Sequence, residues 1–296
     1  MGTVLSSESF VNELRLIVGS DGQIGSSLCK HFQASGLPTV RTTRRETAAD
    51  SSTIRLDLAA PATSWPGFRE VRSAVLCGAV TNGEQCRLNP SATRHVNVYQ
   101  TVRLAERLVE QGAFVVFLSS NAVFDGSKPL RSPNEPVCPM TEYGRQKADA
   151  EVELRSLRDR CAIVRLTKVF HGGLALLQGW LGDLRNQKAI SPYSDYVCAP
   201  ISLEAVVRAI GMVVENELAG VWQLSARTDV AYDGIARTLA RLNKLDESLI
   251  RPIAARQTAN LEHVPQYSTM DASQSEASLG FRIPDPLEVI NTLNII

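Results

Sequence analysis

The stretch LRLIVGSDGQIGSSLCKHFQASG, residues 14–36, joins an apolar run to an amphipathic run through a turn with spaced glycines. The apolar run predicts a buried strand, and the residues after it predict a helix that stops at Gly36. Gly19, Gly22 and Gly25 lie between the end of the strand and the first turn of the helix. Glycines at this point let backbone amides and the positive end of a helix approach a pyrophosphate, so the stretch predicts a dinucleotide-binding turn.

The same alternation of strand and helix continues along the chain. Further apolar runs predict strands within residues 37–43, 52–58, 73–79, 113–120, 161–170 and 220–225. Amphipathic runs predict helices at residues 92–111, from about 141 onward, and at 174–186, 203–215 and 233–242. Strands that alternate with long helices form a parallel sheet covered on both faces. We therefore expect an α/β fold, a Rossmann-type doubly wound parallel sheet.

The regular alternation weakens in the second half of the chain, which predicts a second, smaller part. We expect a dinucleotide-binding domain at residues 1–170 and a smaller C-terminal α/β substrate lobe at residues 171–296. Residues from about 200 to 225 are expected to return to the sheet, so that the two parts interleave.

Composition limits the classes of partner. The 296 residues include 31 basic and 31 acidic side chains, which gives no global electrostatic attraction to nucleic acid or to a membrane surface. No apolar run approaches the roughly 20 residues that span a bilayer, and the opening MGTVLSSESFVNE lacks the features of a signal peptide. The six cysteines show no CxxC spacing and no cluster with the four histidines, so we expect no metal site, reduced thiols and a cytoplasmic location.

Basic residues follow the second predicted strand. An NAD-selective site usually has an acidic residue about 20 positions after the glycine turn, but this chain has VRTTRR at residues 40–45. A guanidinium binds phosphate through a bidentate fork, so the segment favours NADPH (NADP+) over NAD. The alternative is a solvated arginine cluster on a surface turn. The cofactor-binding residues predicted from the two segments are Gly19, Gly22, Gln23, Ile24, Gly25, Thr43, Arg44 and Arg45.

A tyrosine and a lysine stand four residues apart in TEYGRQKADAE, residues 141–151. Four residues are little more than one helical turn, so the Tyr143 phenol and the Lys147 ammonium would lie on one helical face. A nearby ammonium stabilises phenolate, which would move the pKa of Tyr143 towards the working pH of a general acid. The pair alone is weak evidence, and its meaning depends on the motifs before it.

Taken in order, the motifs resemble a known family. The glycine turn, RLDLA, CGAVTN, LSSNAVFDG and YGRQK resemble the extended short-chain dehydrogenase/reductases, in particular the dTDP-4-dehydrorhamnose reductase-like branch. The resemblance implies that Tyr143 donates a proton, that Lys147 holds the nicotinamide ribose, and that Ser120 hydrogen-bonds the substrate carbonyl. It further implies that the cofactor contacts Asp57, Leu58, Ala79, Val80 and Thr81.

Two departures from the branch affect the predicted substrate pocket. Lys168 stands where the rhamnose reductase has a tryptophan that packs on the sugar, and Asn121 and Ala122 replace an Asp-Tyr pair. We expect Ser120, Asn121 and Lys168 to contact the substrate, with the charge of Lys168 facing an anionic group. The alternative is that Lys168 extends into solvent.

The resulting expectation is an NADPH-dependent reductase of a nucleotide-linked keto-sugar or a related keto substrate. Its partner would be a small molecule, without nucleic acid or membrane, and it could form a homodimer. The alternatives are a sugar-nucleotide epimerase or dehydratase that retains its cofactor, and a non-catalytic NADP-binding regulatory subunit.

Overall fold

A computed structural model describes residues 14–46, 52–68, 70–257 and 261–293. Its largest element is a seven-stranded parallel sheet with the order β10-β6-β5-β4-β1-β2-β3. The strands are β1 Leu14–Val18, β2 Thr39–Thr43, β3 Thr53–Arg55, β4 Val71–Leu76, β5 Phe114–Ser120, β6 Cys161–Leu166 and β10 Gly220–Leu224. The order reverses between β1 and β4, the point where doubly wound sheets bind ligands. The predicted fold class is confirmed.

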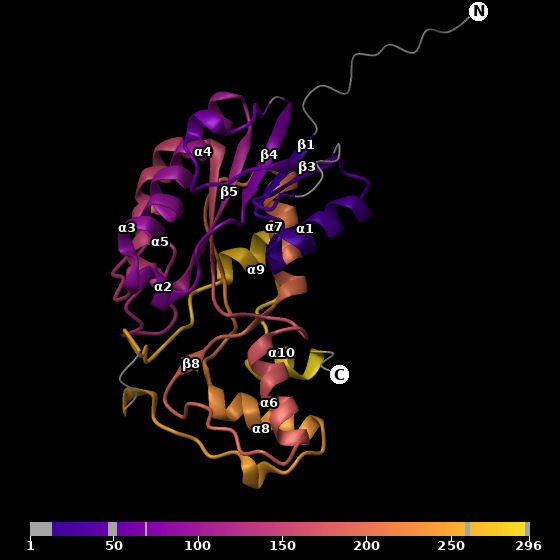
Figure 1. The fold of residues 1–296 in the computed structure, drawn as a ribbon, viewed down its shortest axis with the longest axis vertical. Helices are drawn as coiled ribbons and strands as arrows, with labels where there is room; N and C mark the ends of the chain where they lie inside the picture. The colour runs from indigo at the N-terminus through magenta and orange to yellow at the C-terminus, as the bar shows by residue number, and fades with distance from the viewer. Residues whose placement is uncertain (1–13, 47–51, 69, 258–260, 294–296) are drawn as a thin grey trace, which may run out of the picture.

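The helices lie on both faces of this sheet and below it (Figure 1). They are α1 Gln23–Ala34, α2 Gly83–Leu88, α3 Pro90–Arg94, α4 Thr101–Glu110, α5 Glu142–Leu154, α6 Ala175–Arg185, α7 Leu203–Glu215, α8 Tyr232–Leu242, α9 Ser273–Leu279 and α10 Pro286–Thr292. Short 3-10 helices occupy Ala62–Ser64, Asn121–Val123, Arg155–Arg160, Glu247–Leu249 and Ala255–Gln257.

Alternating side chains explain why both faces of the sheet are covered. Leu16 and Val18 of β1 pack into a cluster with α4 and α5, whereas Ile17 packs into a cluster with α1, α7 and α9. On β5, Phe117 joins the first cluster and Val116 the second. Successive residues of a strand point to opposite faces, so apolar runs of this kind require two helical layers.

The chain leaves the main sheet after β6, returns to it, and leaves again. Between Leu166 and Gly220 it forms α6, three short strands and α7. The short strands are β7 Val169–Phe170, β8 Val197–Cys198 and β9 Ile201–Ser202, and β11 Val230–Ala231 follows β10. β7 pairs with β9, and β8 pairs with β11. α7 then packs against α1, and β10 extends the main sheet beside β6.

A lower part of the molecule has its own apolar clusters. Leu177 and Leu181 of α6 pack with Ile235 and Leu239 of α8 and with Val289 of α10. A second cluster joins α6 to α8 near residue 250. Figure 1 shows α6, α8 and α10 together below the carboxyl edge of the sheet.

Several predicted boundaries were wrong. The helix predicted at residues 92–111 begins earlier and contains a π-helical turn, His95–Gln100, between α3 and α4. The strand predicted at residues 161–170 splits at Leu166, after which the Thr167 amide donates to the Leu224 carbonyl and the chain turns away into β7. The strand predicted at residues 52–58 is only three residues long. The C-terminal helices α9 and α10 were not predicted.

Two negative findings concern the described residues. None of their helices has the length and apolar character needed to cross a membrane. Their histidine, cysteine and carboxylate side chains form no cluster that could hold a metal ion. Residues 1–13, whose sequence lacks the features of a signal peptide, lie outside the described residues.

Candidate active site

The three glycines of the first turn have different structural roles. A Cβ on Gly19, which has φ +82°, would lie 2.6 Å from the Gly78 amide nitrogen, and one on Gly25 would lie 2.5 Å from the Gly19 carbonyl oxygen. These two glycines therefore let β1, β4 and α1 pack closely. A Cβ on Gly22 would meet its nearest atom at 3.6 Å, so packing within the protein does not require glycine there.

The amino-terminal end of α1 is suited to an anion. Gly22 is the N-cap residue, and no side chain accepts a hydrogen bond there. The first amides of a helix lack intrahelical partners and carry partial positive charge. Gln23, which is exposed, and Ile24, which is half-buried, begin the helix at this point. A glycine without a packing role, in front of uncapped amides, fits a dinucleotide pyrophosphate.

The residues after β2 adjoin a second part of this site. Thr43 is buried, and its hydroxyl donates to the Asp21 carboxylate at 2.7 Å. Arg45 is exposed, with its Nε 3.7 Å from the same carboxylate. Arg45 and Arg41 line a cavity of about 420 Å³ between α1 and β2. Arg44 is exposed but does not line this cavity.

Asp57 and Leu58 lie just beyond β3. Leu58 is buried in the cluster beneath α4, and the Asp57 carboxylate accepts from the Ala59 amide at 2.9 Å. The Asp57 carbonyl accepts from the Trp65 indole at 3.1 Å. Asp57 is therefore held at the carboxyl edge of the sheet, on the side of β1 where the adenosine half of a dinucleotide binds.

The segment after β4 is fixed by Asn97, which was not predicted to belong to the site. Buried Asn97, in the π-helical turn, accepts from the Val80 amide at 2.7 Å and donates to the Val80 carbonyl at 2.9 Å. Ala79 and Val80 are half-buried, and Thr81 lines a cavity of about 380 Å³ below the sheet. This segment therefore connects the predicted cofactor and substrate sites.

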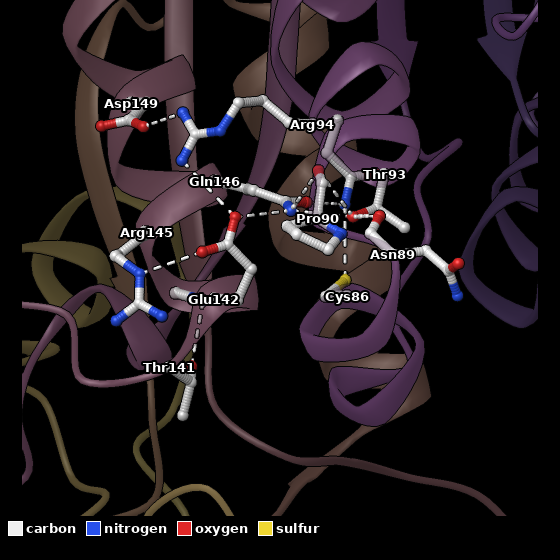
Figure 2. Close-up of polar contacts among 12 residues, drawn as sticks. Cys86, Asn89, Pro90, Thr93, Arg94, Thr141, Glu142, Arg145, Gln146 and Asp149 are labelled. Carbon is white, nitrogen blue, oxygen red and sulfur yellow. Dashed lines mark hydrogen bonds and ion pairs between the residues drawn. The ribbon is translucent and has the colours of Figure 1, made fainter.

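Asn97 also connects this segment to the helix that carries Tyr143. Its amide donates to Gln146 Oε1 at 2.8 Å, and Gln146 Nε2 donates to the Thr93 hydroxyl at 2.8 Å and to Glu142 at 3.0 Å. Figure 2 shows Glu142 between Gln146, Arg94 and Arg145. The start of α5 is thus fixed to the helices that follow β4.

Glycine again permits a close approach at Gly144. A Cβ there would lie 2.1 Å from the Ala122 carbonyl oxygen, a distance that no side chain can occupy. The Gly144 amide donates to the Thr141 hydroxyl, which caps α5. Gly144 therefore lets α5 contact the end of β5, and this contact places Tyr143 beside Ser120.

Lys147 lies at the centre of the predicted catalytic group. Its buried ammonium donates to the Leu118 carbonyl at 2.8 Å and lies 5.9 Å from the centroid of the Tyr143 ring. Burial lowers the pKa of Lys147 to about 8, and the nearby Glu151 carboxylate opposes that shift.

The Tyr143 phenol differs from expectation. Burial raises its pKa above the usual value, the charge of Cys86 adds to this, and a hydrogen bond with Ser120 opposes it. Lys147, which was expected to lower the pKa of Tyr143, is not among these influences, and desolvation of the phenolate is the largest of them. The Ser120 hydroxyl also accepts from the Ala122 amide at 3.1 Å, which fixes it at the end of β5.

Ser120, Asn121, Tyr143 and Lys168 all line a cavity of about 380 Å³ below the sheet. The Asn121 amide donates to the Ser268 carbonyl at 3.4 Å, so this wall is attached to the C-terminal part of the chain. Several other residues that line the cavity were not predicted, among them Phe124, Arg131, Tyr196, Tyr232, His263 and Tyr267. Arg131 belongs to the loop at residues 125–139, which contains four prolines, and long polar loops of this kind often carry binding residues.

Lys168 lies between β6 and β7, at the edge of this cavity. Its side chain is exposed, and no ion pair with it is found within the described ranges. Burial raises the pKa of Cys198 to about 12, and the positive charge of Lys168 opposes that shift, which places the ammonium on the Cys198 side of the cavity. Its position is thus compatible with contact to a substrate and with exposure to solvent.

Comparisons with known proteins agree with this architecture. Residues 15–292 match the family described as RmlD substrate binding domain. The spore coat polysaccharide biosynthesis protein SpsK of Bacillus subtilis is 22% identical over 259 residues, which cover 86% of this chain and 88% of SpsK. Methionine adenosyltransferase 2 subunit beta of Mus musculus is 28% identical over 156 residues, 52% of this chain and 46% of that protein.

Solved structures match across nearly the whole chain. A dTDP-4-dehydrorhamnose reductase from Bacillus anthracis, in complex with NADP, superposes with a TM-score of 0.82 at 17% identity, covering 95% of this chain and 98% of the other. MoeE5 in complex with UDP-glucose and NAD gives a TM-score of 0.79 at 21% identity, covering 94% and 96%. With this fold and the match over residues 15–292, the chain belongs to the RmlD substrate binding domain family, the dTDP-4-dehydrorhamnose reductase-like branch of the extended short-chain dehydrogenase/reductases.

Proposed function

We propose that the protein is an NADPH-dependent reductase of a nucleotide-linked keto-sugar or a related keto substrate. The observation that carries the proposal is the position of Ser120, Tyr143 and Lys147. Ser120 and Tyr143 line the cavity of about 380 Å³, and Lys147, one helical turn after Tyr143, donates to the Leu118 carbonyl just before Ser120. A substrate carbonyl in that cavity would be within reach of both hydroxyl groups.

Each of the three side chains has a distinct task in this proposal. NADPH supplies the hydride when it is bound along the glycine turn. The Ser120 hydroxyl hydrogen-bonds the carbonyl oxygen, and Tyr143 donates its phenolic proton to that oxygen. The Lys147 ammonium holds the nicotinamide ribose and stabilises the phenolate left after proton transfer.

A reductase and an epimerase or dehydratase make opposite demands on Tyr143. A reductase needs the protonated phenol, which donates its proton to the carbonyl oxygen, whereas an epimerase or dehydratase would use the same group first as a base. A single-turnover experiment separates the classes, because only a reductase consumes NADPH in proportion to product. Complete retention of reduced cofactor, with substrate converted, would contradict the proposal.

A non-catalytic regulatory subunit is the alternative from another class, and the partial match to the methionine adenosyltransferase subunit motivates it. Such a protein would bind NADP and a partner enzyme without turnover. We expect instead that the purified chain reduces at least one member of a panel of nucleotide-linked keto-sugars. Failure on the whole panel, together with stoichiometric co-purification of a partner enzyme, would favour the regulatory function.

The choice of NADPH rests on the residues after β2. Arg41, Thr43 and Arg45 line the cavity beside the first turn, and charge-assisted contacts to a 2′-phosphate would favour NADPH over NADH. We expect NADPH to bind at least about tenfold more tightly, which corresponds to about 1.4 kcal/mol. Replacing Arg44 and Arg45 together with alanine should remove this preference, whereas Arg208→Ala on the exposed face of α7 should retain it.

Fluorescence titration of both nucleotides measures the preference directly. Equal affinities in the unmodified protein would contradict the cofactor proposal. We further propose that residues 1–170 bind the dinucleotide and that residues 171–296 hold the nucleotide of the substrate, because Tyr196 and Tyr232 line the same cavity as Tyr143.

A further inference from the structure

We infer that Asp21 limits the preference for NADPH, because its carboxylate lies where the 2′-substituent of the adenosine ribose binds. The inference rests on the proposed binding of a dinucleotide along the glycine turn. It assigns Asp21, which neither the glycine pattern nor the arginine cluster identifies, as a residue that determines cofactor specificity.

Asp21 belongs to the glycine turn, but its side chain reaches the neighbouring strand. The carboxylate Oδ2 accepts from the Thr43 hydroxyl at 2.7 Å, across the gap between β1 and β2. The preceding residues are held in the same direction. The Gly19 amide donates to the Thr42 hydroxyl at 3.0 Å, and the Ser20 amide and hydroxyl donate to the Thr42 carbonyl at 3.0 and 2.9 Å. The hydrogen bond from Thr43 and the bonds that hold the two preceding residues to Thr42 therefore fix the position of the Asp21 carboxylate.

The end of the second strand is where doubly wound dinucleotide sites distinguish the two cofactors. In NAD-selective sites an acidic residue at that point hydrogen-bonds the ribose 2′-hydroxyl, whereas arginine accommodates the 2′-phosphate. This chain has Thr43, Arg44 and Arg45 there, and the carboxylate comes from the first turn instead. In space, Asp21 therefore takes the place of the acidic residue that the sequence lacks after β2.

The charges around the Asp21 carboxylate act in opposite directions on a bound 2′-phosphate. Arg45 Nε lies 3.7 Å from Asp21 Oδ2, so the cation expected to bind phosphate already faces a carboxylate. Arg41 and Lys30 line the same cavity and add positive charge. A 2′-phosphate placed there would be attracted by the three cations and repelled by Asp21, whereas a 2′-hydroxyl could donate to the same carboxylate.

The side chain of Asp21 is about one-third exposed, at 35% of its surface, and that of Arg45 is 71% exposed. Solvent weakens interactions between charges at such positions, so we expect a moderate effect and not an absolute switch. Neutralising Asp21 should leave the fold intact and change the ratio of the two affinities.

The test compares the dissociation constants of NADPH and NADH, by fluorescence titration, in the unmodified protein and in Asp21→Asn. The substitution keeps the size of the side chain and removes its charge. We expect NADPH to bind about five- to tenfold more tightly and NADH to bind equally or more weakly, so that the ratio rises about tenfold. Asp21→Ser is a second variant, in case the amide distorts the turn, and thermal unfolding checks that both variants fold.

Glu204→Gln is the matched control. Glu204 is an exposed acid on α7 that pairs with Arg208 and does not line the cavity beside Asp21, so its replacement removes the same net charge outside that cavity. The affinity ratio should not change in this variant. Combining Asp21→Asn with Arg45→Ala should remove most of the gain, because Arg45 is the cation that the substitution releases.

The outcomes for the inference and for the proposed cofactor are distinct. An unchanged ratio in both Asp21 variants would overturn the inference, even if the unmodified protein prefers NADPH. Equal affinities in the unmodified protein, with a higher ratio in Asp21→Asn, would overturn the proposed preference and support the inference. Absence of binding by either nucleotide, in a folded protein, would overturn both.

Discussion

The two walls of the proposed substrate cavity are built differently. The upper wall, at the carboxyl edge of the sheet, presents Ser120 and Tyr143. Behind it lie the buried Lys147 and the close contact at Gly144, where a Cβ would lie 2.1 Å from a carbonyl oxygen. The lower wall consists of loops and short strands, and it presents the exposed Lys168. In the helices beneath it, a Cβ on Gly179 would meet nothing within 4 Å.

The difference suggests a division of roles, in which the upper wall carries the catalytic groups and the lower wall determines which substrate is accepted. Groups in the upper wall are fixed by backbone contacts and buried hydrogen bonds, so small changes there should cost stability or turnover. Side chains in the lower wall project from loops, which tolerate substitution more easily. Effects of mutation should therefore decrease from the upper wall to the lower wall.

The largest effect is expected at Tyr143. Tyr143→Phe keeps the ring and removes the proton donor, so turnover should fall by on the order of 10² or more. NADPH affinity should change little. Tyr99→Phe is the control, because Tyr99 is 60% exposed on the π-helical turn and its hydroxyl has no role in the proposed chemistry.

Steady-state kinetics with an accepted keto-sugar measures both variants. A Tyr143→Phe protein with nearly unmodified turnover would exclude Tyr143 as the proton donor. It would also remove the main distinction between the two walls.

A pair of glycine substitutions tests the packing difference directly. Gly144→Ala places a methyl group against the Ala122 carbonyl, so α5 must shift, and we expect a loss of about 2–3 kcal/mol in the free energy of unfolding. Gly179→Ala, in the exposed part of α6, should instead stabilise the protein by about 0.5–1 kcal/mol. Denaturant titration gives both values. Equal effects of the two substitutions would contradict the proposed difference in packing.

Gly144 also illustrates what the sequence could reveal. Periodicity predicted the doubly wound sheet. Short apolar runs that alternate along the sequence with amphipathic runs indicate buried strands and covering helices, and this pattern can be recognised without knowing which strands pair. Tyr143 and Lys147 could be identified because two residues that are four positions apart in a helix lie on the same face. Gly144 stands between them, yet the need for glycine depends on Ala122, more than twenty positions away, which only the folded chain brings into contact.

The lower wall was less predictable for the same reason. Tyr196, Tyr232 and Tyr267 come from three separate segments, and no local pattern links them. The Asn97 side chain acts on Val80 and Gln146, which are distant in the sequence, and the π-helical turn that positions it interrupts the periodicity used to predict a single helix. Spacing rules describe one element at a time, whereas these contacts join several.

The pH dependence of turnover offers a smaller, more specific test of the upper wall. Burial lowers the pKa of Lys147 to about 8, so the ammonium loses its proton as the pH rises through that value. If the charged form holds the ribose and stabilises phenolate, kcat/KM should decrease about tenfold per pH unit above about 8.

Lys147→Arg is the informative variant, because guanidinium stays charged over this range. Its absolute rate should be lower, but the decrease above pH 8 should disappear. A decrease that persists unchanged in Lys147→Arg would assign the titration to another group. The pH profile of kcat/KM is the measurement in both cases.

The smallest expected effect concerns Lys168 in the lower wall. An ammonium cannot stack on a sugar as an indole does, but it can pair with a carboxylate or a phosphate, so the cavity should accept a polar or charged substrate. Lys168→Trp should therefore raise KM severalfold, which corresponds to roughly 1 kcal/mol, and leave cofactor binding unchanged. Lys188→Trp, at an exposed lysine after α6, controls for the added aromatic surface.

The severalfold change should appear in KM and not in kcat, because Lys168 lies on the Cys198 side of the cavity and not among the groups that transfer the proton. An unchanged KM would assign specificity to other residues of the lower wall, whereas a loss of kcat comparable to that of Tyr143→Phe would show that the two walls are not separable in function.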